Sequence, residues 1–273
     1  CVLKSGARVH WLAEGNPDGA PIVWIHAGSV EESSHVVADL KPYWSMLRVF
    51  YPDARGHGLS QKSDRVEENT YAWKARDLIE WLDSQGMEGA IFGGPSMGGA
   101  LSLYIASHYP ERARALISIS GPPYGPTPED RAWWRAKRHL VAAGEFEAFY
   151  VENVRLRMSE QVADQLAADP ERLKRATRGL RDHSVGTLLA VLDETYSRAD
   201  WLDACAAIRC PTLIISGAED HFPTEAMSRR VAEVVPGAEL HVVAGAGHFP
   251  LRSHREQVHP ILAAFFQRVL SGA

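Results

Sequence analysis

Ser96 lies in a glycine-rich stretch, Gly94-Pro95-Ser96-Met97-Gly98, between the apolar run "AIF" and a stretch with helical character. Glycines beside such a serine are typical of an abrupt strand-to-helix turn, because they remove side chains that would clash there. The turn would expose the Ser96 hydroxyl at the strand end and direct the N–H of Met97 at an oxyanion formed beside it. Ser96 is therefore a candidate nucleophile, although ordinary strand-to-helix turns also use small residues.

A serine hydroxyl needs a base to take its proton, and the base needs an acid to fix its tautomer. Asp220 follows the apolar run "PTLIISG", and His248 follows the run "ELHVV" in a loop with glycines. Both positions are at the carboxyl ends of expected strands, which is the edge where parallel sheets bind ligands. Taken singly, Asp220 could be a loop or capping residue with Glu219 as the acid, and His248 could be structural. Their joint placement predicts a Ser-His-Asp triad.

Other residues are candidates for supporting roles. Gly28, in the loop "WIHAGSV", allows the close backbone approach that a second oxyanion donor requires. The turn "DARGHG", residues 53–58, is interpreted as structural, which makes His57 a poor candidate for the base. The residues expected to contact substrate are His26, Trp133, Trp134 and Phe249, and for the two tryptophans packing within the fold is an equal alternative.

The elements that must position these residues follow from hydrophobic periodicity. Short apolar runs, rich in Val and Ile, occur at residues 21–27, 47–53, 90–94, 115–120, 211–217 and 239–245. Continuous apolar runs predict strands buried on both faces, as in a parallel sheet. Helical patterns separate most of them, for example the stripe Ala75, Leu78, Ile79 and Leu82, which Gly86 would end. The alternation predicts a doubly wound α/β fold with a mostly parallel sheet.

One long segment breaks this alternation. Between residues 121 and 207 no convincing strand occurs, and Thr127 followed by Pro128 and Asp130 has the pattern of a helix N-terminus. Residues 169–179 repeat an Asp-then-Pro start, and residues 185–196 carry another helical stripe. We therefore expect a core of residues 1–120 and 209–273 with an all-helical cap, residues 121–208, over the site. In the last helix, Pro260 is expected to cause a kink or to reset the helix start.

Composition limits the partners. The 273 residues are 45% hydrophobic and 23% charged, with a net charge of -5 and no basic stretch, so no nucleic-acid partner is expected. No apolar stretch approaches the roughly 18 residues that span a bilayer. The three cysteines form no CxxC pair, which indicates neither a disulfide framework nor a metal site and favours a cytoplasmic protein. The start at Cys1 is interpreted as trimming rather than as a lipoprotein end, and a monomer or homodimer is expected.

The chain resembles the α/β-hydrolase superfamily, in its serine branch with a helical cap. The resemblance covers nearly the whole length through the loop 26–28, the turn "DARGHGLS", the elbow at Ser96, the passage "YPERARALISIS", the acid loop and the "GAGHFP" loop. It implies Ser96 as nucleophile, His248 as base and Asp220 as acid. It also implies the N–H groups of Gly28 and Met97 as the oxyanion hole. A serine at the elbow argues against haloalkane dehalogenases and epoxide hydrolases, which use an aspartate.

The leading hypothesis is a serine hydrolase that cleaves an ester or lactone of a small to medium-sized substrate through an acyl-enzyme, without a metal or organic cofactor. The first alternative is a carbon–carbon bond hydrolase of the meta-cleavage-product type with the same triad. Against it, residues 26–34, "HAGSVEESS", lack the glycine-rich run that such enzymes often carry after the first histidine. The second alternative is a ligand receptor, because the fold alone does not establish turnover.

Overall fold

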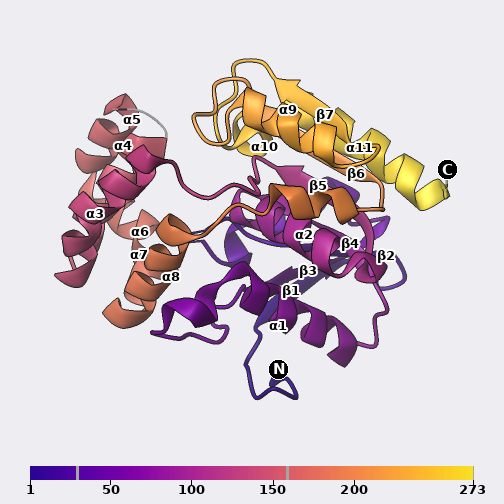
Figure 1. Cartoon of the computed structure of the whole chain (residues 1–273), viewed down its shortest axis with the longest axis horizontal. Helices are drawn as coiled ribbons and strands as arrows, with labels where there is room; N and C mark the ends of the chain where they lie inside the picture. Colours follow the sequence, from indigo (N-terminus) through magenta and orange to yellow (C-terminus); the bar gives the residue numbers. More distant parts are fainter. Residues whose placement is uncertain (29–30, 158–159, 273) are drawn as a thin grey trace.

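The computed structural model of the chain describes residues 1–28, 31–157 and 160–272 (Figure 1). Among these residues one seven-stranded sheet has the order β1-β3-β2-β4-β5-β6-β7. Its strands are β1 (Trp11–Gly15), β2 (Ala20–Trp24), β3 (Leu47–Pro52), β4 (Ala90–Pro95), β5 (Ala113–Ile119), β6 (Thr212–Gly217) and β7 (Glu239–Val243). Only the edge strand β1 pairs antiparallel, with β3, and every other pairing in this sheet is parallel. The predicted mostly parallel sheet is confirmed.

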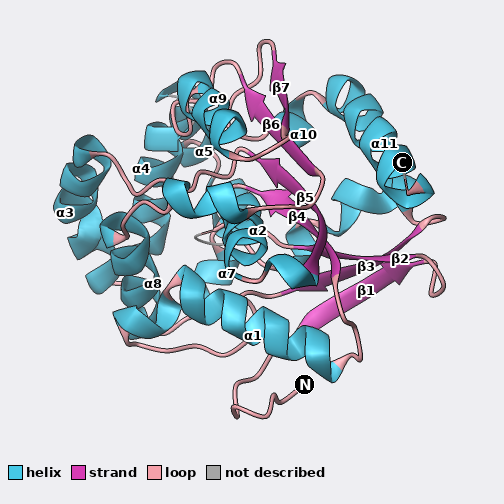
Figure 2. Ribbon diagram, turned by 45° about the vertical axis from the view of Figure 1, so that its right-hand side comes forward, coloured by secondary structure: helices cyan, strands magenta, loops and turns pink. Residues whose placement is uncertain are grey.

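Helices cover both faces of this sheet (Figure 2). Successive side chains of a strand point to opposite faces of the sheet, and in β2 Val23 packs in one hydrophobic core and Trp24 in the other. Both faces are therefore apolar and need a covering layer. One face is covered by α1 (Tyr71–Ser84), α2 (Met97–His108) and α9 (Glu225–Val234). The opposite face is covered by the 3-10 helix η2 (Val37–Tyr43), by α10 (Pro250–Ser253) and by α11 (Arg255–Ser271). Shorter 3-10 helices are η1 (Ser33–His35), η3 (Val66–Asn69), η4 (Pro110–Arg112) and η5 (Leu202–Ala207).

The predicted helix boundaries follow local capping. Helix α1 ends at Ser84, and Gly86 just beyond it has a φ of +69°, a left-handed conformation that glycine adopts without steric cost. Helix α11 runs through Pro260 instead of starting there, so the predicted reset of the helix start is wrong.

Among the described residues between β5 and β6, six further helices form the helical insertion, residues 128–197. They are α3 (Pro128–Ala142), α4 (Phe146–Arg157), α5 (Glu160–Ala167), α6 (Pro170–Ala176), α7 (Arg178–Arg181) and α8 (Val185–Ser197). Figure 1 shows them beside the sheet, on the left of the view. The Thr127 hydroxyl accepts a hydrogen bond from the N–H of Asp130, whose carboxylate accepts one from the N–H of Thr127, so the predicted cap is present.

The insertion has its own core, which includes Trp134, Phe149 and Leu192. Helix η5, which the sequence assigned to the cap, instead packs against the sheet layer through the buried Cys205. No helix in the described part of the chain is both long and apolar enough to cross a bilayer.

Candidate active site

Ser96 stands on a strained turn between β4 and α2. Its φ and ψ are 51° and −115°, a conformation that a non-glycine residue rarely adopts. The Ser96 N–H donates a 2.7 Å hydrogen bond to the Ile119 carbonyl on the neighbouring strand, which fixes the turn. A Cβ on Gly94 or on Gly98 would lie 2.0 Å from the Ile25 carbonyl oxygen, so both positions require glycine. The elbow predicted from the spacing of these residues is therefore formed.

Three side chains from separate loops meet at this turn. The Ser96 Oγ and the His248 Nε2 are 2.9 Å apart, and the His248 Nδ1 is 2.9 Å from the Asp220 Oδ2. Because an ionised carboxylate can only accept, Nδ1 carries the proton and Nε2 is left to accept the serine hydrogen. This tautomer is the one that removes a proton from a serine hydroxyl.

Asp220 is held in place by its own loop. The Asp220 side chain is 2% exposed, and its second oxygen, Oδ1, accepts a 3.0 Å hydrogen bond from the N–H of Phe222. Glu219 has an exposed side chain, and its main-chain N–H donates to the Ala246 carbonyl at 2.8 Å. The structure therefore pairs His248 with Asp220 and not with Glu219.

Two main-chain N–H groups border the same site. A Cβ on Gly28 would lie 3.3 Å from the Cβ of Met97, so the two backbones are close neighbours. Within the described residues, neither the Gly28 N–H nor the Met97 N–H donates to another group, and both residues line the cavity beside Ser96. Two free donors beside a nucleophile can stabilise the negative oxygen of a tetrahedral intermediate.

A partly exposed ion pair joins the loop of Gly28 to α10, the helix that follows His248. The Glu31 carboxylate accepts two hydrogen bonds from the Arg252 guanidinium, at 2.5 and 2.8 Å. Burial alone would raise the pKa of Glu31, but the hydrogen bonds and charge of Arg252 outweigh burial and hold it below its usual value. The bidentate pair therefore connects these two parts of the chain.

A cavity of about 1120 Å³ opens beside the three side chains. Its wall comes from the core, including Ser96 and His248, and from the insertion, including Tyr150 and Val154 of α4 and Val191 of α8. A space of this size holds a small to medium-sized organic molecule.

The residues expected to contact substrate divide into two groups. Phe249 lines the cavity, with its ring edge-on to His248 at 4.8 Å between centroids. Trp134 instead stacks on Tyr196 and donates to Asp193 at 2.8 Å, and Trp133 also packs on Tyr196. Neither tryptophan is part of the described cavity wall, so packing within the insertion explains both.

His26 also lies away from the cavity. It is fully buried, its Nδ1 lies 2.6 Å from the Ala27 carbonyl oxygen, and its Nε2 accepts from the Ala54 N–H at 3.0 Å. Burial lowers the pKa of this histidine. Since both ring nitrogens are used inside the protein, His26 positions the loop of Gly28, and the expected substrate contact does not fit this placement.

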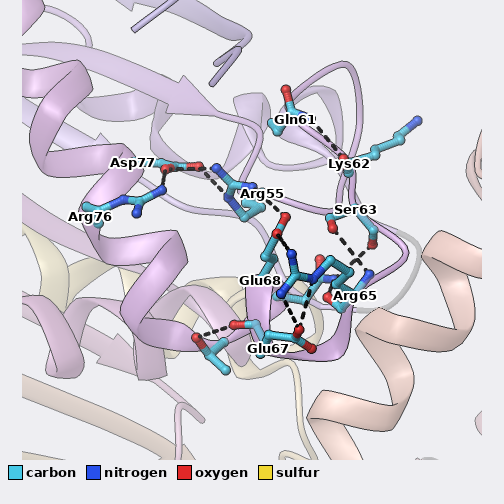
Figure 3. Close-up of polar contacts among 11 residues, drawn as sticks. Arg55, Gln61, Lys62, Ser63, Arg65, Glu67, Glu68, Arg76 and Asp77 are labelled. Carbon is cyan, nitrogen blue, oxygen red and sulfur yellow. Dashed lines mark hydrogen bonds and ion pairs between the residues drawn. The ribbon is translucent and has the colours of Figure 1, made fainter. Parts of the chain in front are cut away.

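The turn of residues 53–58 is structural, as predicted. The Asp53 carboxylate accepts hydrogen bonds from the main-chain N–H groups of Ser33 and Leu59, at 2.7 and 2.9 Å. The Arg55 guanidinium donates to both carboxylate oxygens of Asp77 on α1, and Figure 3 shows this pair together with a second group of charged side chains around Arg65. The turn is thereby attached to α1.

Several cavity residues were missed by the sequence analysis, among them Lys74 on α1, and Glu194 and Arg198 at the end of α8. A signal for Lys74 exists, because it follows Tyr71 by three residues and precedes Leu78 by four, on the apolar stripe of α1. A charge on a buried stripe is an indication of function.

No group of three or more His, Cys, Asp or Glu side chains in the described ranges is arranged to hold a metal.

The sheet, the elbow and the site define an α/β hydrolase. A family model described as "Alpha/beta hydrolase family" matches residues 22–261, and the chain belongs to this family. It is 25% identical over 255 residues to Esterase YbfF of Escherichia coli, covering 92% of this chain and 94% of that protein. It is 26% identical over 226 residues to a 2-hydroxy-6-oxononadienedioate/2-hydroxy-6-oxononatrienedioate hydrolase of Burkholderia vietnamiensis, covering 81% and 77%.

The same fold is found in solved structures. The enol-lactonase from Burkholderia xenovorans LB400 superposes with a TM-score of 0.79 at 20% identity, over 98% of this chain and 99% of that chain. At this identity the likeness establishes the fold, while the activity has to be argued from the site.

Proposed function

We propose that this chain is a serine hydrolase that cleaves an ester or lactone of a small to medium-sized organic substrate through an acyl-enzyme. The observation that carries the proposal is the continuous hydrogen-bonded series Asp220, His248 and Ser96, which ends beside a large cavity. An esterase and an enol-lactonase among the similar proteins agree with this reaction class.

The roles follow from the positions of the atoms. As the Ser96 Oγ attacks the substrate carbonyl carbon, the Nε2 of His248 accepts the hydroxyl proton, and Asp220 stabilises the resulting imidazolium. The N–H groups of Gly28 and Met97 bind the oxyanion, contributions commonly worth about 2.7–4 kcal/mol each. His248 then protonates the leaving alcohol. It next takes a proton from water, which attacks the acyl-enzyme and releases the acid and free Ser96.

We assign the helical insertion, residues 128–197 of the range 121–208 predicted from the sequence, the role of a cap. The support is that Tyr150, Asn153 and Val154 of α4 and Val191 of α8 share one cavity wall with Ser96. In this arrangement the core supplies the reacting groups and the insertion supplies much of the surface that selects the substrate.

The experiment that tests the proposal is treatment with a fluorophosphonate probe and peptide mapping of the adduct. We expect stoichiometric labelling at Ser96, loss of labelling in Ser96→Ala, and a large reduction in His248→Ala because the nucleophile then lacks its base. Hydrolysis of p-nitrophenyl acetate should be lost in the same variants. Folded wild-type protein that neither reacts with the probe nor turns over esters contradicts the proposal and supports the ligand-receptor alternative.

A carbon–carbon bond hydrolase would use the same three side chains, so probe labelling does not distinguish it. Substrates do, because a vinylogous diketone that is cleaved when simple esters and lactones are not would reverse the assignment of the scissile bond. We favour the ester or lactone, in agreement with the esterase among the sequence relatives.

A further inference from the structure

A buried lysine lies in the cavity wall without a carboxylate partner. Lys74 is 1% exposed, and its Nζ donates a hydrogen bond to the main-chain carbonyl of Asn69. It forms no ion pair with any carboxylate of the described residues. Burial lowers the pKa of Lys74, and the nearby charge of Glu194, which makes no ion-pair contact with it, opposes that shift. A buried ammonium is costly unless it is paired, so a further counter-charge in direct contact would stabilise it.

A second cation lines the same wall. Arg198, at the end of α8, donates hydrogen bonds from its guanidinium to the main-chain carbonyls of Tyr124 and Thr195 and to no described carboxylate. The Lys74 Nζ lies 5.7 Å and the Arg198 Cζ 5.2 Å from the centre of the Tyr71 ring, so both cations adjoin the same aromatic ring and act on each other electrostatically. The two positive groups therefore belong to one cluster, although they come from α1 and α8.

One carboxylate, Glu194, belongs to this cluster and is 4% exposed. Of the other acids in the described cavity wall, Glu31 is paired with Arg252 and Asp220 with His248, and the Glu219 side chain is largely exposed. The cluster of Lys74, Arg198 and Glu194 thus carries two positive charges and one negative charge. One further negative charge would balance it.

The cluster adjoins the loop that borders the nucleophile. The ring of His57 lies 5.0 Å from the ring of His26, which fixes the loop of Gly28, and His57 also interacts electrostatically with Lys74. The His57 Nδ1 lies 3.1 Å from the Arg55 carbonyl oxygen, and its buried Nε2 has no hydrogen-bond partner within the described residues. A substrate can therefore contact the cluster and Ser96 within one cavity.

We propose that Lys74 and Arg198 form a subsite for a free carboxylate, so that the substrates of this hydrolase are esters or lactones that carry a second, negatively charged carboxylate. The inference rests on the proposed hydrolase function and names its substrate class. The ammonium and guanidinium would each donate to the carboxylate, while Glu194 disfavours a second anion and keeps the subsite selective for a single negative charge.

The wall that carries Lys74 is held rigidly, which such selectivity requires. Arg55 of the turn that bears His57 is joined to Asp77 of α1 by hydrogen bonds of 2.6 and 3.1 Å, as Figure 3 shows. Since Asp77 follows Lys74 by three residues on the same helix, this pair fixes both parts of the wall. A preorganised cation loses little entropy when the anion binds.

The test compares matched substrates. Mono-p-nitrophenyl esters of succinic, glutaric and adipic acid carry the free carboxylate, and their methyl-capped counterparts have the same shape without the charge. We expect wild-type kcat/KM to favour the acid over the capped ester by about tenfold or more at one or more chain lengths. Lys74→Met should lower this ratio of kcat/KM for the acid over the capped ester about tenfold, and Glu194→Gln should raise the ratio. Lys4→Met, which removes an exposed lysine at the N-terminus, should keep the wild-type ratio.

The outcomes separate this inference from the proposed function. A wild-type protein that hydrolyses the capped esters and labels at Ser96, but shows no preference for the acid at any length, remains a hydrolase and overturns the subsite. An unchanged ratio in folded Lys74→Met also overturns it. If that variant fails to fold, inhibition of the wild type decides. Glutarate should inhibit hydrolysis of a capped ester about tenfold more strongly than pentanoate, which has the same length and one carboxylate, and equal inhibition rejects the subsite.

Discussion

The carboxylate of Asp77 and the guanidinium of Arg55 form a bidentate ion pair in which both side chains are nearly fully buried, at 3% and 4% exposure. A second arginine nearby, Arg65, pairs with Glu67, but there the side chains are 67% and 63% exposed. Each pair is joined by two hydrogen bonds, but the first pair is buried in the protein and the second is exposed to solvent.

Removing one member of the buried pair should therefore be far more destabilising than removing one member of the exposed pair. Asp77→Ala leaves a buried guanidinium without its carboxylate and should lower the free energy of unfolding by about 3–5 kcal/mol. Glu67→Ala should leave the urea midpoint nearly unchanged, because water replaces the lost partner. Urea denaturation measures both, and similar midpoints for the two variants would show that the Arg55 pair is not a structural connection.

The acid of the triad can be tested against its neighbour. Asp220→Asn should lower kcat for ester hydrolysis by about 10⁴-fold, because the amide no longer holds His248 in the tautomer that accepts the serine proton. Glu219→Gln should keep most of the activity, since its exposed side chain makes no described contact with His248. Steady-state kinetics measure both, and a loss of the same size in Glu219→Gln would mean that the wrong carboxylate has been identified.

The meeting of the three proposed triad side chains could be predicted because each of them depends on local sequence. Ser96, Asp220 and His248 each follow an apolar run, and parallel strands bring their carboxyl ends to one edge whatever the detailed packing. The N-terminus of α3 was predictable for the same reason, since Thr127 and Asp130 satisfy each other within one turn.

The subsite residues could not be placed in this way. Lys74 and Arg198 meet only because α1 and α8 are packed against the same cavity, and one sequence carries no information on that contact. The substrate contact expected for His26 failed for a related reason. The Nε2 of His26 accepts a hydrogen bond from the N–H of Ala54, which lies 28 residues later in the chain, after β3. Periodicity indicates which side of a helix is buried, but not what lies opposite.

The elbow provides a test of steric fit. Gly98→Ala would place a Cβ 2.0 Å from the Ile25 carbonyl oxygen, so the start of α2 has to move away from the loop that leads to Gly28. We expect a loss of about 1–3 kcal/mol in unfolding free energy and much slower fluorophosphonate labelling, because Ser96 and the oxyanion donors move apart.

A glycine with free space around it is the matched control. Gly144 has a φ of +74° and nothing within 4 Å of an added Cβ, so Gly144→Ala should cost about 1–2 kcal/mol from backbone strain alone. Its labelling rate should equal that of the wild type. If Gly98→Ala also labels at the wild-type rate, then contact between the elbow and Ile25, the residue after β2, is not what positions the nucleophile.

Acid stability should depend on His57. Burial, followed by electrostatic interaction with His26 and Lys74, holds the pKa of His57 well below its ordinary value of 6.5. Below pH 6.5 the unfolded chain binds a proton at this residue that the folded chain does not, so the folded state loses stability as the pH falls. The slope approaches about 1.4 kcal/mol per pH unit for each such histidine.

His57→Gln removes this proton uptake from the unfolded state. We therefore expect its unfolding free energy, measured by urea denaturation between pH 6.5 and 5, to fall less steeply than that of the wild type. Ser120→Ala alters another buried side chain that has no hydrogen-bond partner among the described residues but removes no titrating group, and should shift the whole curve without changing its slope. An equal slope in His57→Gln and the wild type would show that the folded protein protonates His57 as readily as the unfolded chain. Lys74 would then have beside it a histidine that becomes charged as the pH falls, and the charge of the proposed carboxylate subsite would itself change with pH.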